Sequence, residues 1–204
     1  YAGMEAAIQE ALQELGREYI DIFLLHAARV EGNPIDQRPG AWECLLDYKR
    51  KGYIRAVGAS THAVSAVQAL TSTSDVDVIF ALLNKASLGI IGGSADQMKS
   101  ALQLAAAAGK GLYSMKLLGG GSLLVDILDA IAYGRAIPEL TAHAVGMVHM
   151  QELEMNLRIF NDEPVTPEEL AKIKQGKSWT LMRSLCKGCG HCVETCPSFA
   201  LELQ

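Results

Sequence analysis

Five short runs of β-forming residues, each followed by a helical pattern, constrain the fold of this chain more than any other feature. The predicted strands cover residues 19–25, 53–59, 76–83, 111–115 and 140–145. The predicted helices cover residues 4–15, 41–51, 63–71, 95–108, 123–133 and 149–160. Short apolar strands that alternate with helices are typical of a parallel sheet with helices packed on it. In such folds, the chemistry takes place where the strands end at their carboxyl side.

A single histidine, His26, directly follows the first predicted strand. Its place at the carboxyl end of a strand makes it a candidate functional residue. The alternative is a histidine at a strand end that has no role. Residues 27–40 then contain glycine, asparagine and two prolines, which predict a loop without regular structure. A loop of this length is either functional or an ordinary surface connection.

The spacing of the predicted strands indicates the kind of parallel sheet. The strands recur at intervals of roughly 20 to 35 residues, which fits the ~30 residues per unit of a (β/α)8 barrel. An open, doubly wound sheet is the competing architecture, since five strands would complete one. The glycine fingerprint of that fold is absent after the first strand, where Leu25, His26 and Ala27 stand instead.

Composition excludes several classes of protein. Half of the 204 residues are hydrophobic and 20% are charged, and no apolar run approaches the ~18 residues of a membrane-spanning helix. We therefore expect a cytoplasmic globular protein without a membrane partner. The net charge of −5, with no basic cluster, argues against nucleic-acid binding. The chain opens on Tyr1, and no basic and apolar leader follows, so we expect it to be the later part of a longer protein.

Four of the five cysteines lie in the run Cys186-x2-Cys189-x2-Cys192-x3-Cys196-Pro197. This spacing reproduces the run of bacterial ferredoxins that ligates a 4Fe–4S cluster, and it predicts these four residues as metal ligands. A zinc site, or disulfides and free thiols, are the alternatives. In two-cluster ferredoxins, the cysteine before the proline binds the other cluster. The fourth ligand is therefore either Cys196 or a group from elsewhere.

The fifth cysteine, Cys44, lies in a predicted helix and is expected to be a small buried residue. The clustering of the other four is unlike a secreted disulfide framework and indicates a reducing compartment.

Several segments, in order and spacing, resemble landmarks of the aldo-keto reductases over about residues 4–160. They are Leu-Gly-x-x-Tyr-Ile-Asp-Ile-Phe-Leu-Leu-His at 15–26, Gly-Tyr-Ile-Arg-Ala-Val-Gly at 52–58 with Ser60-Thr61-His62, Ser-Met-Lys-Leu-Leu-Gly-Gly-Gly at 114–121, and Val-Gly-Met at 145–147 with Glu152, Leu153 and Asn156. The resemblance implies a (β/α)8 TIM barrel. It also implies an oxidoreductase that transfers hydride between NADP or NAD and a small-molecule carbonyl or alcohol.

The resemblance also implies a catalytic set of aspartate, tyrosine, lysine and histidine, in which the tyrosine is the general acid. Only the histidine has a counterpart here, which is His26. By this resemblance the chain starts at the helix before the fourth barrel strand, so its five strands correspond to barrel strands 4 to 8. We therefore expect an incomplete barrel, and we expect the chain alone to lack a complete proton-donating apparatus.

The same resemblance implies a set of cofactor-binding residues. Ser60 and Thr61 would bind the nicotinamide carboxamide, and the loop 116–121 would wrap the pyrophosphate. A helix N-terminus after the turn at 146–147 would favour a phosphate. The departures from the family pattern include Leu117, Phe80 and the segment 148–150, so NAD and NADP both remain possible. The full predicted set is Ser60, Thr61, Lys116, Leu118, Gly119, Gly146, Met147 and Asn156.

We predict two domains: a partial barrel over residues 1–162, and a helical linker with a ferredoxin-like iron–sulfur tail over residues 163–204. Aldo-keto reductases with such a tail form a subgroup that this chain resembles. The alternative function is a non-catalytic iron–sulfur module, either structural or exchanging electrons with a partner. Because an incomplete barrel has unpaired edges, we also expect a second copy or a missing N-terminal segment to cover them.

Overall fold

The computed structural model describes residues 1–175, and their side chains up to residue 171. It forms two compact units, Tyr1–Gly146 and a second unit from Met147 onwards. The division into compact units differs from the domain boundary expected after residue 162, and that boundary stays a prediction.

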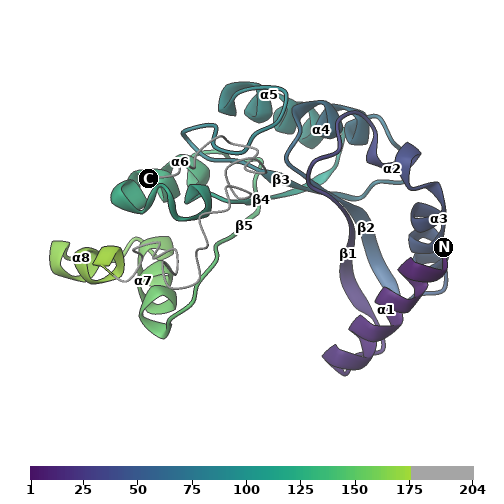
Figure 1. Cartoon of the computed structure of the whole chain (residues 1–204), viewed down its shortest axis with the longest axis horizontal. Coiled ribbons are helices and arrows are strands. Elements are labelled where there is room, and N and C mark those ends of the chain that lie inside the picture. The colour runs from purple at the N-terminus through teal and green to yellow at the C-terminus, as the bar shows by residue number, and fades with distance from the viewer. Residues whose placement is uncertain (176–204) are drawn as a thin grey trace, which may run out of the picture. The chain divides into compact units, whose positions relative to one another are not determined.

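The first unit contains a parallel sheet of five strands in the order β1-β2-β3-β4-β5, which is also their order along the chain (Figure 1). The strands are β1 Ile20–Ala27, β2 Ile54–Thr61, β3 Val78–Leu82, β4 Gly111–Met115 and β5 Ala142–Ala144. Neighbouring strands pair in parallel throughout. The predicted α/β class and the partial barrel are confirmed. The predicted end of the first strand is wrong, because His26 lies within β1 and pairs with Ser60.

Helices connect the strands as the periodicity predicted. Those of the first unit are α1 Ala2–Leu15, α2 Pro34–Gln37, α3 Pro39–Arg50, α4 Val64–Thr71, α5 Ala95–Ala107 and α6 Ile127–Arg135, with 3-10 turns η1 Gly119–Gly121 and η2 Leu124–Asp126. The short helix α2 was missed within the expected loop. Its N-cap, Asn33, accepts a hydrogen bond from the Ile35 amide at 3.1 Å, and Pro34 stands at its first position.

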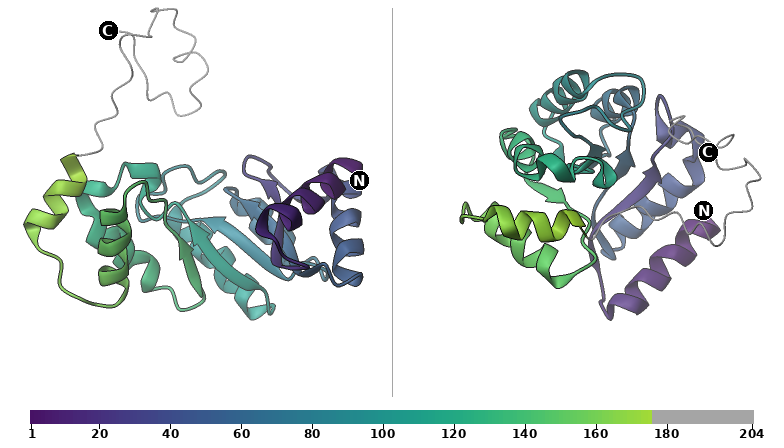
Figure 2. Two further views of the ribbon diagram at one scale, coloured as in Figure 1. Left: turned by 90° about the horizontal axis from the view of Figure 1, so that it is seen from below. Right: turned by 60° about the vertical axis from the view of Figure 1, so that its left-hand side comes forward.

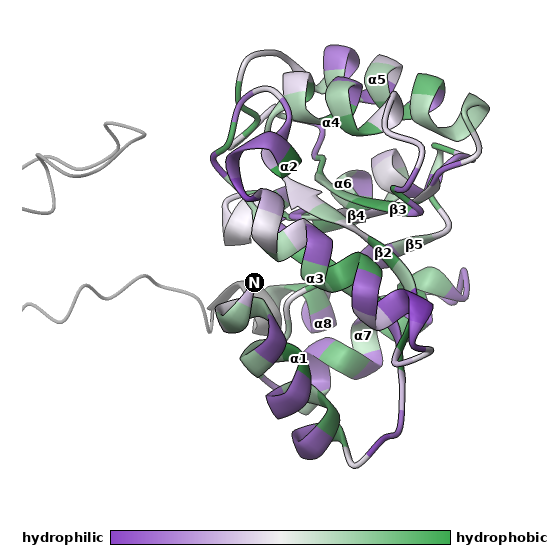
Figure 3. Cartoon of the chain, turned by 90° about the vertical axis from the view of Figure 1, so that its right-hand side faces the viewer, coloured by the Kyte–Doolittle hydropathy of each residue, from purple (hydrophilic) through white to green (hydrophobic). Residues whose placement is uncertain are grey.

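The hydrophobic core lies between one face of the sheet and the helices (Figures 1 and 2). Alternate strand residues Leu25, Val57, Ile79 and Leu112 point into it and are at most 2% exposed. Each such side chain contributes about 1.5–3 kcal/mol by leaving water. Figure 3 shows the mixed hydropathy of the helices α1 and α3, whose buried residues include Ile8 and Leu45. Cys44 in α3 is fully buried, as predicted.

The opposite face of the sheet carries Leu24, His26, Ser60, Phe80 and Tyr113. Phe80 and Tyr113 are register neighbours, and their rings stack with centroids 4.0 Å apart. In a closed barrel this face would line the interior. Among the described residues, β1 and β5 each pair on one side only. The expectation that another segment or a second copy covers these edges stays a prediction.

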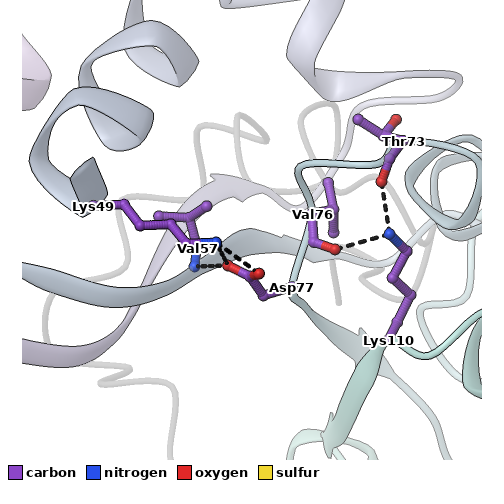
Figure 4. Close-up of polar contacts among 6 residues, drawn as sticks. All are labelled: Lys49, Val57, Thr73, Val76, Asp77 and Lys110. Carbon is purple, nitrogen blue, oxygen red and sulfur yellow. Dashed lines mark hydrogen bonds and ion pairs between the residues drawn. The ribbon is translucent and has the colours of Figure 1, made fainter.

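Two lysines and an aspartate tie the amino ends of the central strands together (Figure 4). The Asp77 carboxylate accepts hydrogen bonds from the Val57 amide at 2.8 Å and from the Lys49 ammonium at 2.6 and 2.7 Å. The Lys110 ammonium donates to the carbonyl oxygens of Thr73 and Val76 at 2.6 and 2.8 Å. Because these contacts lie at the opposite end of the strands from His26, we assign them to stability.

The second unit contains α7 Met150–Phe160 and α8 Pro167–Gln175. The Glu152 carboxylate accepts a hydrogen bond from the Val148 amide at 2.6 Å ahead of α7. Thr166 caps α8, since its hydroxyl accepts a hydrogen bond from the Glu169 amide at 3.3 Å. Within the described part of the chain, no helix is long and apolar enough to cross a membrane.

Candidate functional site at the carboxyl ends of the strands

His26 and Ser60 form a side-chain pair on the face of the sheet that the helices leave uncovered. The parallel register of β1 and β2 places them opposite each other. The His26 Nδ1 and Ser60 Oγ atoms are 2.8 Å apart. Ser60 is only 5% exposed, whereas the His26 side chain is exposed. The Arg38 guanidinium donates a hydrogen bond to the His26 carbonyl, which ties the loop before α3 to this strand.

Thr61 follows Ser60 but belongs to the opposite face of the sheet. It is fully buried, and its hydroxyl accepts a hydrogen bond from the Ala63 amide at 3.0 Å. Since successive strand residues alternate between faces, Ser60 and Thr61 cannot both present their side chains to one ligand. The structure therefore brings Ser60, and not Thr61, beside His26.

His62 is a second histidine at this end of the sheet, and the sequence reasoning did not select it as a site residue. Its amide donates to the Ala28 carbonyl at 3.1 Å, and its carbonyl accepts from the Ile91 amide at 2.9 Å. Burial lowers the pKa of the His62 imidazole, and the nearby charges of Lys116, His26 and Arg29 lower it further. The sequence did contain a signal for His62. It ends a run of three polar residues, Ser-Thr-His, at the carboxyl end of β2.

The loop after β4 exposes its backbone. Lys116 has a φ of 65°, and Gly119, Gly120 and Gly121 also have positive φ values. An added Cβ at Gly119 would lie 2.9 Å from the Leu88 Cδ1 atom, the end of a side chain that can move, so the positive φ is what favours glycine here. An added Cβ at Gly120 would meet nothing within 4 Å. The loop thus offers bare backbone to a ligand at Gly120, which fits the close approach of a phosphate.

The buried side chain of Leu118 anchors this loop. Leu118 is 9% exposed, and its carbonyl accepts hydrogen bonds from the amides of Gly121 and Leu123 at 2.9 and 3.1 Å. Lys85, after β3, lies 3.4 Å from Asp126 and 3.8 Å from Asp129. These ion pairs connect the end of β3 to the segment that follows the glycines.

The remaining predicted site residues lie outside this group. Gly146 ends the first unit, and Met147 and Asn156 belong to the second. Asn156 is 6% exposed, and its Oδ1 atom has no hydrogen-bond partner in the part of the chain that the structure describes. The four cysteines, Cys186, Cys189, Cys192 and Cys196, lie outside the described residues.

A serine and a histidine also pair on the helix-covered face of the sheet. Ser114 Oγ and His143 Nδ1 are 2.7 Å apart, and these residues are register neighbours in β4 and β5. Burial lowers the pKa of His143, and the Arg135 charge lowers it further. Ser114 is fully buried, so this pair lies in the packed layer between the sheet and the helices.

The lowered pKa values of His62 and His143 predict that acid destabilises the first unit. Both imidazoles bind protons less readily in the folded than in the unfolded chain, so the unfolded chain gains protons first as the pH falls. Stability should be constant well above the usual histidine pKa of about 6.5 and should fall below it. Urea unfolding at pH 8 and pH 5.5 measures this, followed by tryptophan fluorescence in a Trp179→Phe background that leaves Trp42 as the one tryptophan. A double variant, His62→Gln and His143→Gln, should lose less stability over that interval, and an unchanged loss would contradict the assignment.

A parallel strand–helix arrangement, with polar side chains and a glycine loop at the carboxyl ends of the strands, is typical of α/β barrels. A family model described as "Aldo/keto reductase family" matches residues 1–130. The chain belongs to this family. A model described as "4Fe-4S binding domain" matches residues 180–202. This match confirms that the cysteine run is an iron–sulfur sequence motif.

Solved structures show the same fold. A Pseudomonas aeruginosa protein assigned to the aldo-keto reductases is 21% identical, with a TM-score of 0.61 over 78% of this chain and 56% of the other. The holo form of an aldo-keto reductase from Bacillus halodurans is 18% identical, with a TM-score of 0.61 over 87% of this chain and 67% of the other. The chain thus spans little more than half the length of the first of these. No curated protein matches it significantly.

Proposed function

We propose that the whole protein interconverts a carbonyl and an alcohol on a small molecule with a nicotinamide cofactor, NADP or NAD. The observation that carries this proposal is the pairing of His26 with Ser60 at the carboxyl ends of β1 and β2, in a chain of the aldo/keto reductase family. When bound, the nicotinamide would supply or accept the hydride.

His26 would hold the substrate oxygen. Its Nδ1 atom lies against Ser60, which leaves Nε2 as the ring nitrogen available to hydrogen-bond a carbonyl oxygen. Ser60 would contact the carboxamide, because Thr61 is fully buried on the opposite face of the sheet. Lys116 and the backbone of Gly119 and its neighbours would lie against phosphate. The aspartate, tyrosine and lysine implied by the family have no counterpart in these residues, so we expect nucleotide binding by the chain without turnover.

Replacing Lys116 with glutamate tests the phosphate contact. Lys116 is exposed, and reversing its charge should weaken the binding of NADPH or NADH at least about tenfold, which corresponds to about 1.4 kcal/mol. Quenching of nucleotide fluorescence in a titration measures the dissociation constant. The matched control is Lys99→Glu on α5, which makes the same change of charge away from the strand ends and should leave the affinity unchanged. Equal affinities for the wild type and Lys116→Glu would refute the phosphate contact.

The match to the 4Fe–4S binding domain favours a second candidate function, an iron–sulfur module that exchanges electrons with a partner or pins the C-terminal segment. A reducing setting such as the cytoplasm suits such a cluster, because the ligands are thiolates. This function requires neither nicotinamide binding nor turnover, so the nucleotide titration separates the two candidates.

An anaerobic visible spectrum, with analysis of iron, sulfide and zinc, tests the cluster. We expect a brown protein with four iron and four sulfide per chain, as the definition of the 4Fe–4S cluster requires. Bleaching by dithionite would favour electron exchange, whereas a spectrum that dithionite leaves unchanged would favour a structural cluster. A colourless protein that contains zinc would refute both iron–sulfur roles.

A further inference from the structure

The Ser60 hydroxyl has a single hydrogen-bond partner among the described residues, the Nδ1 atom of His26. Ser60 is only 5% exposed, so little of this residue is open to water. A buried hydroxyl that donates to nothing loses the free energy of a hydrogen bond. The hydroxyl hydrogen therefore has one acceptor in reach, which is the lone pair of Nδ1.

The alternative direction of this hydrogen bond leaves a group unsatisfied. If Nδ1 carried the proton and donated it to Ser60, the serine oxygen would accept and its own hydrogen would point at no acceptor. If Ser60 donates, both groups are satisfied and the ring proton of neutral His26 is on Nε2. His26 is exposed, so the Nε2 hydrogen is open to an incoming ligand.

We infer that Ser60 is a positioning residue that fixes the tautomer and the ring orientation of His26, so that Nε2–H is presented to the substrate oxygen. The role toward a substrate rests on the proposed function. The hydrogen bond between Ser60 and His26 does not depend on that function. An oxygen lone pair of Ser60 remains available after it donates to Nδ1. A carboxamide N–H can donate to that lone pair, so one hydroxyl would connect a bound nicotinamide to the histidine.

The backbone supports this role for Ser60. Arg38 holds the His26 carbonyl, and the β1–β2 ladder fixes both α-carbons, so the backbone that carries the two side chains is held in place. The pair Ser114 and His143 repeats the same serine–histidine contact at 2.7 Å on the covered face of the sheet. That second pair provides an internal control, because it lies on the face that carries no candidate ligand contact.

Long-range proton–nitrogen NMR spectra of the 15N-labelled full chain test the inference. The ring-nitrogen signals of a neutral imidazole report which nitrogen carries the proton, so the spectra are recorded at pH 8. We expect His26 to show only the Nε2–H form in the wild type. Ser60→Ala should raise the Nδ1–H share of His26 to that of free N-acetylhistidine in the same buffer. Ser60→Thr, which keeps the hydroxyl, should retain the wild-type pattern.

The control variant Ser114→Ala should change the signals of His143 and leave those of His26 as they are. Unchanged His143 signals in Ser60→Ala show that the variant is folded. A wild-type His26 with its proton on Nδ1, or a Ser60→Ala spectrum identical to the wild type, would overturn the inference.

A separate titration of wild type and Ser60→Ala with NADPH tests the proposed function. If the wild type binds no nucleotide, the proposed function fails while the tautomer result stands. If it binds nucleotide and Ser60→Ala leaves the tautomer unchanged, the inference alone fails.

Discussion

Replacing Gly58 with alanine is expected to destabilise the first unit by about 4 kcal/mol or more, which places it among the severest single substitutions. Gly58 lies in β2 opposite Val78 of β3. A Cβ added there would come within 1.7 Å of the Val78 carbonyl oxygen and 2.7 Å of its carbonyl carbon. Because these are backbone atoms, neither strand can yield without breaking the ladder. Urea unfolding followed by Trp42 fluorescence, in the Trp179→Phe background, measures the loss.

Two further glycines serve as controls for this substitution. Gly134→Ala in α6 would place its Cβ 2.6 Å from a terminal methyl group of Leu117, and a side-chain end can move. That variant should be clearly milder than Gly58→Ala. Gly3→Ala in α1 meets nothing within 4 Å and should be neutral or slightly stabilising, since alanine favours helices. If Gly58→Ala were as stable as the wild type, the backbones of β2 and β3 could not lie this close together at Gly58 and Val78.

Asp77→Ala should cost about 1.5–3 kcal/mol, the second-largest effect we expect. The Asp77 carboxylate accepts the Val57 amide hydrogen bond at 2.8 Å and pairs with Lys49. Both charged side chains are about one-third exposed, at 33% and 34%, so the ion pair itself contributes less than about 1 kcal/mol. Most of the loss therefore comes from the unpaired Val57 amide. The free energy of unfolding in urea provides the measurement.

Comparison with two conservative variants separates these contributions. Asp77→Asn keeps an oxygen acceptor for Val57 and should recover most of the stability. Lys49→Met removes only the ion pair and should cost at most about 1 kcal/mol. If Lys49→Met proved as damaging as Asp77→Ala, the ion pair would dominate, and our account of the amide would be incorrect.

The sequence was sufficient for the order of strands and helices because hydrophobic periodicity is a local property. Leu25, Val57, Ile79 and Leu112 were each part of an apolar run, and each lies in the core. The fifth strand is shorter than predicted for a local reason. The Leu140 amide donates to the Ile137 carbonyl at 3.1 Å, so Leu140 belongs to a turn and only Ala142–Ala144 pair with β4.

The contacts of the site could not be predicted in the same way, because they depend on register between segments far apart in the sequence. His26 and Ser60 were both selected as candidates, but their 2.8 Å contact follows from the pairing of β1 with β2. Thr61 was selected with Ser60, although strand alternation sends its side chain to the buried face. His62 was not selected, because its closeness to Lys116 arises only when β2 and β4 share one sheet.

Lys116 holds a left-handed backbone conformation, with a φ of 65°, at a position where glycine would be unstrained. A residue with a Cβ costs about 1–2 kcal/mol there, and its side chain is exposed and fills no part of the core. The fold therefore tolerates a loss of folding free energy at the residue whose charge we propose to contact a phosphate. Efforts to make this protein more heat-resistant would select glycine at residue 116 early, and the gain in melting temperature would come with a weaker hold on the nucleotide.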